Sequence, residues 1–435
     1  MACSPGLLSP TAAEARICEL LHPLDRHQDR ELLPLAQCRG RILAEPIASP
    51  LDFPHWDNSA MDGYAVIAAD LAAACPESPV SLQVSQEIPA GTVPTTPLQP
   101  GQAARLFTGA MMPPGADTVI MQEQAHRQGD RVTVGMAPQP GAWVRKQGAF
   151  HQAGQPLLAA GSRLGAPDLA ILAAAQCAMV PVYRQLRVAI LSTGDELVGI
   201  DQPLAPGQIV DSNRYALAAL VTETGAIAQV LDPVRDDRSA LKTAITAAAS
   251  TADVILSSGG VSVGDYDYID QILTELGADL AIRSVAVKPG KPLTVATIPA
   301  NLQTPPGSNL PPTSIPRPCL YFGLPGNPVS STVSFWRFVQ PALRRLGGEP
   351  AATGRWLSLP TTAALTSKGD RETYVWGRLE TQSTDLGPAL AFVPALGQQN
   401  SANLINLAQT QALGVVPIGT EEIPAGSIVS VLWVG

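Results

Sequence analysis

The sequence has 435 residues and a formal net charge of −9 at pH 7. An acidic surface disfavours nucleic acid, whose phosphates are recognised by basic side chains, so we expect no nucleic-acid partner. Apolar residues make up 46% of the chain, and its length allows roughly two to four domains, so the sequence predicts a multidomain globular protein.

The cysteines and the apolar runs predict a cytoplasmic location. The six cysteines form no Cys-x-x-Cys pair, which argues against a zinc site or a disulfide framework and favours a reducing compartment. The N-terminus lacks the basic and apolar regions of a secretory signal. No apolar run approaches the roughly 18 residues of a transmembrane helix, so no membrane partner is expected.

The first part of the chain predicts a helical domain split by a β module. Residues 9–22 have the pattern of a capped amphipathic helix, and a second helix is expected at 165–177. Between them, residues 50–150 contain short alternating apolar runs separated by Pro and Gly turns, which is typical of strands. We therefore expect residues 9–49 and 151–182 to form one helical domain that carries an inserted β module.

The second part of the chain predicts an α/β domain followed by a β domain. From residue 183 to 348 strands alternate with helices, which indicates a mostly parallel sheet with helices on both faces. The Pro-, Ser- and Asn-rich stretch 299–318 is expected to be a surface loop. From residue 351 to 435 short alternating runs return, which predicts a C-terminal β domain.

Polar, glycine-rich loops follow the predicted strands of the α/β domain. They read "STGDEL", "DPVRDD", "SSGGVSVGDYD" and "GLPGNPVS". Ligands of open α/β sheets bind beyond the carboxyl ends of the strands, where these loops lie. We therefore expect the carboxylates of Glu196, Asp236 and Asp267 to meet at one rim.

The loop "KPGKP" contains Lys288 and Lys291, two of only five lysines in the chain. Flanking prolines and Gly290 stiffen this loop, and it is expected to reach the same rim. Lysine ammonium groups bind phosphate and oxyanions, and carboxylates hold Mg²⁺. The combination predicts a site for a polyanion and a divalent cation, and the alternative is that both lysines are solvated surface charges.

Several enzyme motifs are incomplete. "GGVSVG" is followed by Asp265 where a P-loop requires Lys. The same stretch places Ser262 in a G-x-S-x-G context, but all five histidines precede it, which disfavours a hydrolase with a triad in chain order Ser–Asp–His. Ser262 therefore fits an anion-binding nest better. Ser330, in the first turn of a predicted helix, fits an oxyanion site or a plain helix start.

Six motifs in this order resemble the molybdopterin molybdenumtransferase family, to which the C-terminal catalytic domain of gephyrin is related. They are "DNSAMDGYAV", "TGAMMPPGADTVIMQE", "STGDEL", "SSGGVSVGDYDY", "KPGKP" and "GLPGNPVS". The resemblance implies an elongated homodimer whose subunits contain the domains above, the last of them barrel-like. It also implies a Mg²⁺-dependent reaction of adenylylated molybdopterin with molybdate, as a substrate, to give molybdenum cofactor and AMP. Other cofactor-biosynthesis enzymes are further candidate partners.

The resemblance also implies site residues. The catalytic candidates are Asp62, Thr108, Glu196, Asp236 and Asp267. Two of these, Asp236 and Asp267, are the candidate metal ligands. The substrate-binding candidates are Lys288, Lys291, Ser262, Pro325, Ser330, Arg371 and Ser401.

Two positions depart from the family pattern. Phe150 stands where the family has an Asp, and Ser284 stands where a basic residue is common. We expect Phe150 to pack on neighbouring apolar surface. Two alternatives stay open. One is an adenylyltransferase of the same pathway, which uses a similar α/β domain. The other is a non-catalytic molybdopterin-binding scaffold or carrier, which Phe150 keeps open.

Overall fold

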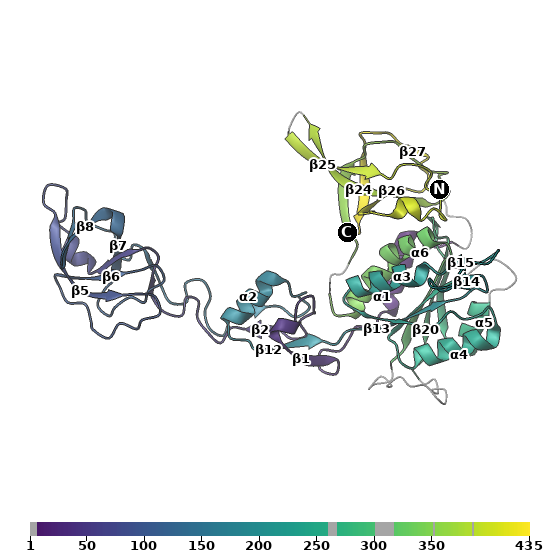
Figure 1. Cartoon of the computed structure of the whole chain (residues 1–435), viewed down its shortest axis with the longest axis horizontal. Helices are drawn as coiled ribbons and strands as arrows, with labels where there is room; N and C mark the ends of the chain where they lie inside the picture. The colour runs from purple at the N-terminus through teal and green to yellow at the C-terminus, as the bar shows by residue number, and fades with distance from the viewer. Residues whose placement is uncertain (1–6, 260–267, 301–316, 351–352, 385–386) are drawn as a thin grey trace. The chain divides into compact units, whose positions relative to one another are not determined.

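The computed structural model describes residues 7–259, 268–300, 317–350, 353–384 and 387–435 (Figure 1). The chain forms two compact units. The larger unit contains residues 1–44, 161–165 and 179–435, and the smaller unit contains residues 45–160 and 166–178. None of the described helices is both long and apolar enough to cross a membrane.

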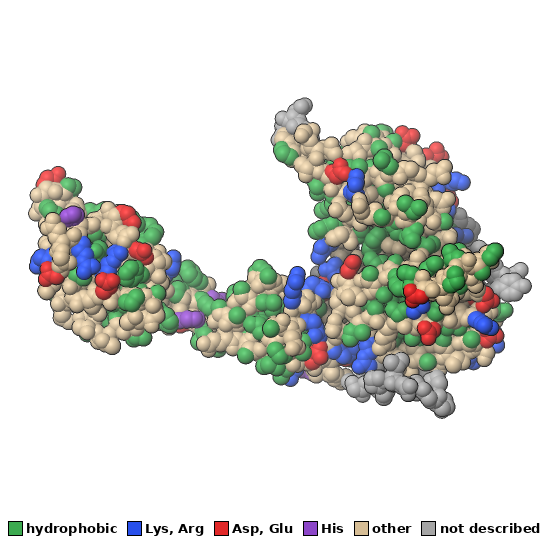
Figure 2. Space-filling view, viewed as in Figure 1, with side chains coloured by type: hydrophobic (Ala, Val, Ile, Leu, Met, Phe, Trp, Pro, Cys, Tyr) green, Lys and Arg blue, Asp and Glu red, His purple; other side chains and the backbone are tan. Residues whose placement is uncertain are grey.

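The smaller unit is built around a mixed six-stranded sheet, as the alternating pattern of residues 50–150 predicts. Its strands, in spatial order, are β7 (Thr118–Met121), β4 (Gly63–Val66), β6 (Gln102–Leu106), β5 (Val80–Ile88), β9 (Arg131–Val134) and β8 (Ala125–Gln128). Successive residues of a strand point to opposite faces, so Tyr64 joins one apolar cluster and Ala65 the other. On the visible surface of this smaller unit, basic and acidic side chains are interspersed (Figure 2).

The larger unit contains the predicted α/β domain. Its sheet has the order β16 (Ile227–Val230), β13 (Arg187–Ser192), β17 (Val254–Ser258), β21 (Cys319–Leu324), β20 (Pro292–Ile298) and β18 (Asp279–Ser284). The first four strands are parallel, and β20 and β18 add antiparallel pairs at one edge. The expectation of a mostly parallel sheet is therefore confirmed.

Helices cover both faces of this sheet. Helix α3 (Asn213–Glu223) places Leu217 on the face that carries Ile190, while α4 (Arg238–Ala249) places Leu241 on the face that carries Leu191. Helix α5 (Tyr268–Glu275) lies with α4, and α1 (Pro10–Leu20) lies with α3. The alternation of buried residues along β13 thus supplies two apolar cores, one for each helix layer.

The predicted helix whose first turn contains Ser330 has an irregular middle. It begins as α6 (Pro328–Ser334), widens into the π-helical turn η4 (Phe335–Val339) and ends as α7 (Gln340–Leu346). Pro341 lies just after the wide turn. Proline has no backbone N–H and its ring crowds the carbonyl four residues earlier, so a regular α-helix through this position is unfavourable.

The C-terminal β domain is confirmed, and it continues into the α/β domain through β19 (Val287–Lys288). The strand order is β19, β24 (Glu372–Thr384), β26 (Ala412–Val416), β28 (Ile428–Trp433) and β22 (Arg355–Pro360), and β25 (Gly387–Pro394) pairs with β24. Lys288 stands opposite Thr373 in the parallel pair of β19 and β24. The first residue of the lysine loop is thereby fixed to the C-terminal sheet.

Backbone pairing also joins the segments on either side of the inserted β module. In the larger unit, β1 (Arg30–Pro34) pairs with β12 (Met179–Tyr183). Helix α1 belongs to the larger unit, whereas α2 (Ala166–Ala174) belongs to the smaller one. The division into residues 9–49 plus 151–182, 50–150, 183–348 and 351–435 stays a proposal, which the β1–β12 pairing supports.

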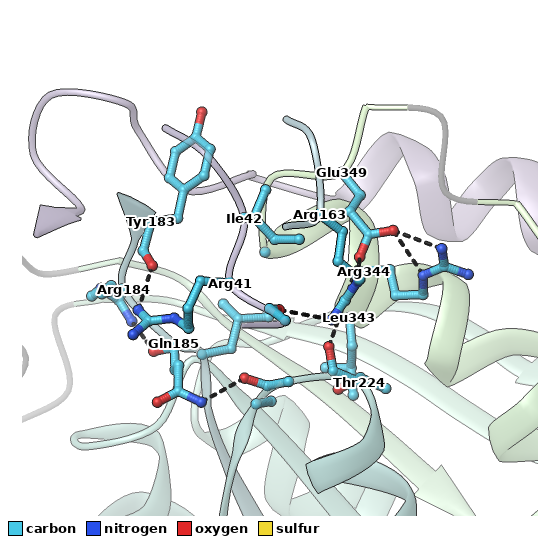
Figure 3. A pocket seen from close by; sticks show the side chains of 15 residues that line it. Arg41, Ile42, Arg163, Tyr183, Arg184, Gln185, Thr224, Leu343, Arg344 and Glu349 are labelled. Atoms are coloured by element: carbon cyan, nitrogen blue, oxygen red, sulfur yellow. Dashed lines mark hydrogen bonds and ion pairs between the residues drawn. The ribbon is translucent and has the colours of Figure 1, made fainter. Parts of the chain in front are cut away.

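An ion-pair network surrounds a small cavity of about 30 Å³ in the larger unit (Figure 3). Glu349 accepts hydrogen bonds from Arg163 Nε (2.8 Å) and from Arg344 Nη2 (2.7 Å). Arg184 forms a bidentate ion pair with Asp253, in which Nη1 donates to Oδ2 (2.8 Å) and Nη2 donates to Oδ1 (2.7 Å). Because these guanidinium groups already have carboxylate partners, we interpret the cluster as structural. It connects segments that are far apart in the sequence.

Candidate active site

A cleft of about 1680 Å³ opens in the larger unit between the α/β domain and the C-terminal domain. It is bordered by the loop after β13, the start of α3, the lysine loop, the loop between β21 and α6, and two segments of the C-terminal domain. The residues expected from the sequence that line it are Glu196, Lys288, Lys291, Pro325, Ser330, Arg371 and Ser401. Segments that are far apart in the sequence therefore share one open volume, at the carboxyl ends of β13, β17 and β21.

The lysine loop owes its position to Gly290. This residue has φ +105°, and a Cβ atom there would lie 2.7 Å from the Oγ of Ser334 in α6. Only glycine lets the backbone lie this close to the helix in this conformation. The loop is also closed by a hydrogen bond from the Val285 N–H to the Lys291 carbonyl oxygen (3.0 Å).

The two lysine ammonium groups are available for a ligand. Lys288 is half-buried and Lys291 is exposed, and both line the cleft. Neither forms an ion pair with a carboxylate in the part of the chain that the structure describes. The prediction that the loop reaches the rim is confirmed, and the free charges favour an anion as the bound group.

The C-terminal domain adds a guanidinium group and a hydroxyl group to the cleft. Arg371 donates from Nη1 to the Val287 carbonyl oxygen (3.3 Å), which ties it to the start of the lysine loop. Ser401 accepts a hydrogen bond at its carbonyl oxygen from the Val329 N–H (3.3 Å). Its Oγ lies 3.4 Å from Asn327 Nδ2, at the start of α6, where Ser330 is 3% exposed.

The acidic rim is only partly described. Glu196 lines the cleft, and so does Thr193, whose hydroxyl donates to Asp236 Oδ1. The backbone N–H of Asp236 lies 3.4 Å from Asp195 Oδ1, so the Asp195 carboxylate contacts the backbone at Asp236. Ser262 and Asp267 lie outside the described residues. Among the residues that are described, no group of three or more His, Cys, Asp or Glu is arranged to hold a metal.

Asp62 and Thr108 form a contact of their own in the smaller unit. Asp62 Oδ1 accepts hydrogen bonds from the backbone N–H and from the hydroxyl of Thr108, both at 2.7 Å. These two donors hold the pKa of the Asp62 carboxyl below its ordinary range. The next residue, Gly63, cannot carry a side chain, because a Cβ would lie 1.9 Å from the Ile120 carbonyl oxygen.

Phe150 does not pack as expected. Its side chain is 72% exposed, and its backbone N–H donates to the Phe53 carbonyl oxygen (2.8 Å). The turn before it is held by Asp57, which accepts from Lys146 Nζ and from the Gln147 N–H, each at 2.8 Å. Burial raises the pKa of Asp57, but these hydrogen bonds outweigh burial and lower it overall. The conformation of the turn therefore does not depend on the aromatic ring.

Asp211 and Asn213, which belong to none of the motifs named above, also line the cleft. Asn213 Nδ2 donates to Ser258 Oγ (2.6 Å) and to the Gly326 carbonyl oxygen (2.8 Å). It thus links the first turn of α3 to the carboxyl ends of β17 and β21. The stretch "DSNR" has the composition of a helix start, so the sequence by itself indicates a helix cap and not a binding site.

Three family models match the chain in sequence order. The MoeA N-terminal region (domain I and II) matches residues 8–175, and the probable molybdopterin binding domain matches residues 189–345. The MoeA C-terminal region (domain IV) matches residues 358–434. The last two models contain the residues that border the cleft.

Similar proteins match over nearly the whole length. A molybdopterin molybdenumtransferase of Nostoc sp. strain PCC 7120 is 52% identical over 421 residues, which cover 96% of this chain and 91% of the relative. Molybdopterin molybdenumtransferase 2 of Mycobacterium tuberculosis is 34% identical, with 91% of this chain and 93% of the relative covered. The solved structure of the molybdopterin biosynthesis MoeA protein from Pyrococcus horikoshii OT3 aligns with a TM-score of 0.80 at 26% identity and covers 98% of this chain and 100% of that one. The chain belongs to the molybdopterin molybdenumtransferase (MoeA) family.

Proposed function

We propose that the chain is a molybdenumtransferase, which converts adenylylated molybdopterin and molybdate to molybdenum cofactor and AMP. The observation that carries this proposal is the shared cleft. Two lysines without a carboxylate partner among the described residues line it, together with an arginine and two serines from separate segments. Relatives that carry the name molybdopterin molybdenumtransferase match 96% and 91% of the chain, which supports the same reaction here.

The cleft residues have two binding tasks in this reaction. Molybdate is a dianion, so the Arg371 guanidinium and the hydroxyls of Ser330 and Ser401 suit its oxygens as charged and neutral donors. The ammonium groups of Lys288 and Lys291 suit the phosphates, which they attract as point charges. Binding both reactants in one cleft would replace an encounter in solution by a reaction between neighbours.

Mg²⁺ belongs to this proposal as a further component. Asp236 lies beside Asp195 and Thr193, which supplies the hard oxygen donors that Mg²⁺ prefers, and Asp267 is proposed as the second carboxylate ligand. Bound there, the ion would neutralise negative charge on the departing phosphate. Asp236 would hold the ion, and Thr193 would fix the direction of that carboxylate through its hydroxyl group.

The remaining parts of the proposal concern assembly and location. Asp62 and Thr108 are proposed to act in the same reaction, from the β module, and we propose a cytoplasmic homodimer in which the β module of one subunit serves the cleft of its partner. A role in the reaction is supported by the hydrogen bonds from the N–H and the hydroxyl of Thr108, which keep Asp62 ionised. Asp62 would thus place a fixed negative charge beside the reactants.

AMP release from adenylylated molybdopterin, assayed with and without molybdate, tests the reaction. We expect molybdate-dependent release that falls at least 100-fold in Lys288→Ala, since such a change removes a charged contact from the reacting phosphates. Lys368→Ala removes one of the other lysines, which does not line the cleft, and is the control. Formation of adenylylated molybdopterin from ATP would indicate an adenylyltransferase, and binding without any AMP release would indicate a carrier.

A further inference from the structure

Asp211 is a buried carboxylate at the edge of the cleft. It follows β15 (Ile209–Val210) and directly precedes Ser212 and α3. Its N–H donates to the Val198 carbonyl oxygen (3.1 Å), so the backbone at this position is fixed by a neighbouring segment. The residue borders the cleft, yet it is only 2% exposed. Its side chain is therefore held in place and screened from bulk water.

The two carboxylate oxygens of Asp211 have different surroundings. Oδ1 accepts a hydrogen bond from the Arg214 N–H (3.2 Å) and so caps α3. Oδ2 is buried and has no hydrogen-bond partner among the described residues. Burying an ionised oxygen without a donor is unfavourable, and native structures keep such groups rarely and for a reason.

Helix capping does not explain why Oδ2 is buried. Asp237 caps α4 in the same way, by accepting from the Ala240 N–H at 2.8 Å, and its side chain remains exposed to solvent. A cap thus needs only one oxygen, and the second oxygen of Asp237 is free to bind water. At Asp211 the second oxygen is buried without a partner although the residue lines the cleft, so a ligand that binds at this edge of the cleft can supply the missing donor.

We propose that Asp211 binds the pterin end of the substrate. This inference rests on the proposed function. A pterin presents an amino group and an adjacent ring N–H on the edge of its 2-amino-4-oxopyrimidine ring, which makes two donors side by side. An ionised carboxylate offers acceptors only, and each oxygen has two lone pairs, so Oδ2 and the free position on Oδ1 match this edge.

The same chemistry distinguishes the pterin from the adenine of the adenylylated substrate. Adenine places its amino donor next to a ring nitrogen that is an acceptor, and that lone pair would face the carboxylate. The nearby Asn213 amide group already donates to Ser258 and Gly326, so it does not compensate for this repulsion. Lys288, Lys291 and Arg371, on other elements, suit the phosphates of this substrate and the separate molybdate ion.

Binding of two small pteridines tests the inference on the full chain. Pterin carries the amino group, whereas lumazine has a carbonyl in its place and so presents an acceptor to the carboxylate. By fluorescence titration we expect pterin to bind about 10- to 100-fold more tightly than lumazine, the range for a hydrogen bond to a charged group. Asp211→Asn should remove this preference, because the side-chain amide group turns N–H donors toward the pterin edge.

The controls separate ligand binding from folding. Asn is a good helix cap, so Asp211→Asn is expected to keep α3, and its thermal unfolding is recorded beside the titrations. Asp237→Asn removes a capping charge from α4 and should leave the preference for pterin unchanged. The comparison of pterin with lumazine on the unsubstituted chain does not depend on any variant.

Equal binding of the two pteridines, or no binding of pterin at millimolar concentration, overturns the inference. The inference is also overturned if Asp211→Asn leaves the affinity for pterin unchanged. The same holds if this substitution weakens the binding of AMP alone. The AMP-release assay is read separately. If the chain prefers pterin through Asp211 but releases no AMP, the inference stands and the proposed reaction is refuted. If the chain releases AMP but does not prefer pterin, the reaction stands and the inference is refuted.

Discussion

The Asp62 carboxylate is held ionised by two donors from a single residue. Thr108 supplies both its N–H and its hydroxyl, and together they lower the pKa of Asp62. We expect Thr108→Val to raise this pKa toward its ordinary value, because valine keeps the N–H and loses the hydroxyl. A ¹³C NMR titration of the carboxyl carbon measures it, and Asp57, which has other partners, is the internal control.

The pH dependence of stability follows from the same contact. A carboxyl group whose pKa is lower in the folded state stabilises the fold above the pKa of the unfolded chain. That contribution disappears as the pH falls through the folded pKa. We therefore expect the unsubstituted chain to lose stability on acidification more steeply than Thr108→Val, and the contact would be refuted by identical acid unfolding curves.

Phe150 gives a second prediction for a single residue. Because its side chain is 72% exposed, Phe150→Asp is expected to change the free energy of unfolding by no more than about 0.5 kcal/mol. If the family's acid at this position serves the reaction, the substitution raises the rate of molybdate-dependent AMP release. Phe150→Ser removes the ring without adding an acid and should leave the rate as it is. A fall in melting temperature with Phe150→Asp alone would contradict this expectation.

At the scale of an element, the lysine loop depends on its contact with α6. Gly290→Ala adds a methyl group 2.7 Å from Ser334 Oγ at a backbone φ of +105°. We expect unfolding to become easier by about 1–3 kcal/mol and AMP release to fall, because the loop must move away from the helix and carry Lys288 and Lys291 with it. Chemical denaturation and the rate assay are the measurements.

Two substitutions separate backbone strain from crowding in this loop. Gly419 has φ +85° with no atom within 4 Å of a Cβ, so Gly419→Ala should show the strain alone and keep full activity. Ser334→Gly combined with Gly290→Ala removes the crowding and should restore part of the rate. Full activity of Gly290→Ala on its own would show that the loop does not need this contact.

At the scale of the whole molecule, the proposed homodimer can be tested by complementation. Asp62→Asn and Lys288→Ala alter different compact units, so each variant is expected to be inactive alone. Random exchange of subunits makes about half of the dimers mixed, and one of the two sites in each mixed dimer is intact, so about a quarter of the activity should return. Light scattering should give twice the chain mass of 45.4 kDa. An active monomer, or mixed variants that stay inactive, would rule the assembly out.

Local patterns in the sequence determined the order of the elements and part of the site. Alternation predicted the strands of residues 50–150, and strand–helix repetition predicted the parallel core from residue 183 to 348. The Pro and Gly residues around Lys288 and Lys291 predicted a short rigid loop at the rim. These features depend on neighbouring residues, whose spacing and backbone preferences can be read along the chain.

Contacts between distant segments decided the rest, and only the tertiary structure contains them. Arg371 and Ser401 enter the cleft because β24 pairs with β19 and because Val329 donates to the Ser401 carbonyl. Phe150 is exposed, although its apolar side chain predicted packing. In the sequence, Asp211 and Asp237 both look like caps. They differ in whether the second oxygen is exposed to water or buried without a partner at the edge of the cleft, which depends on the surrounding packing and not on adjacent residues.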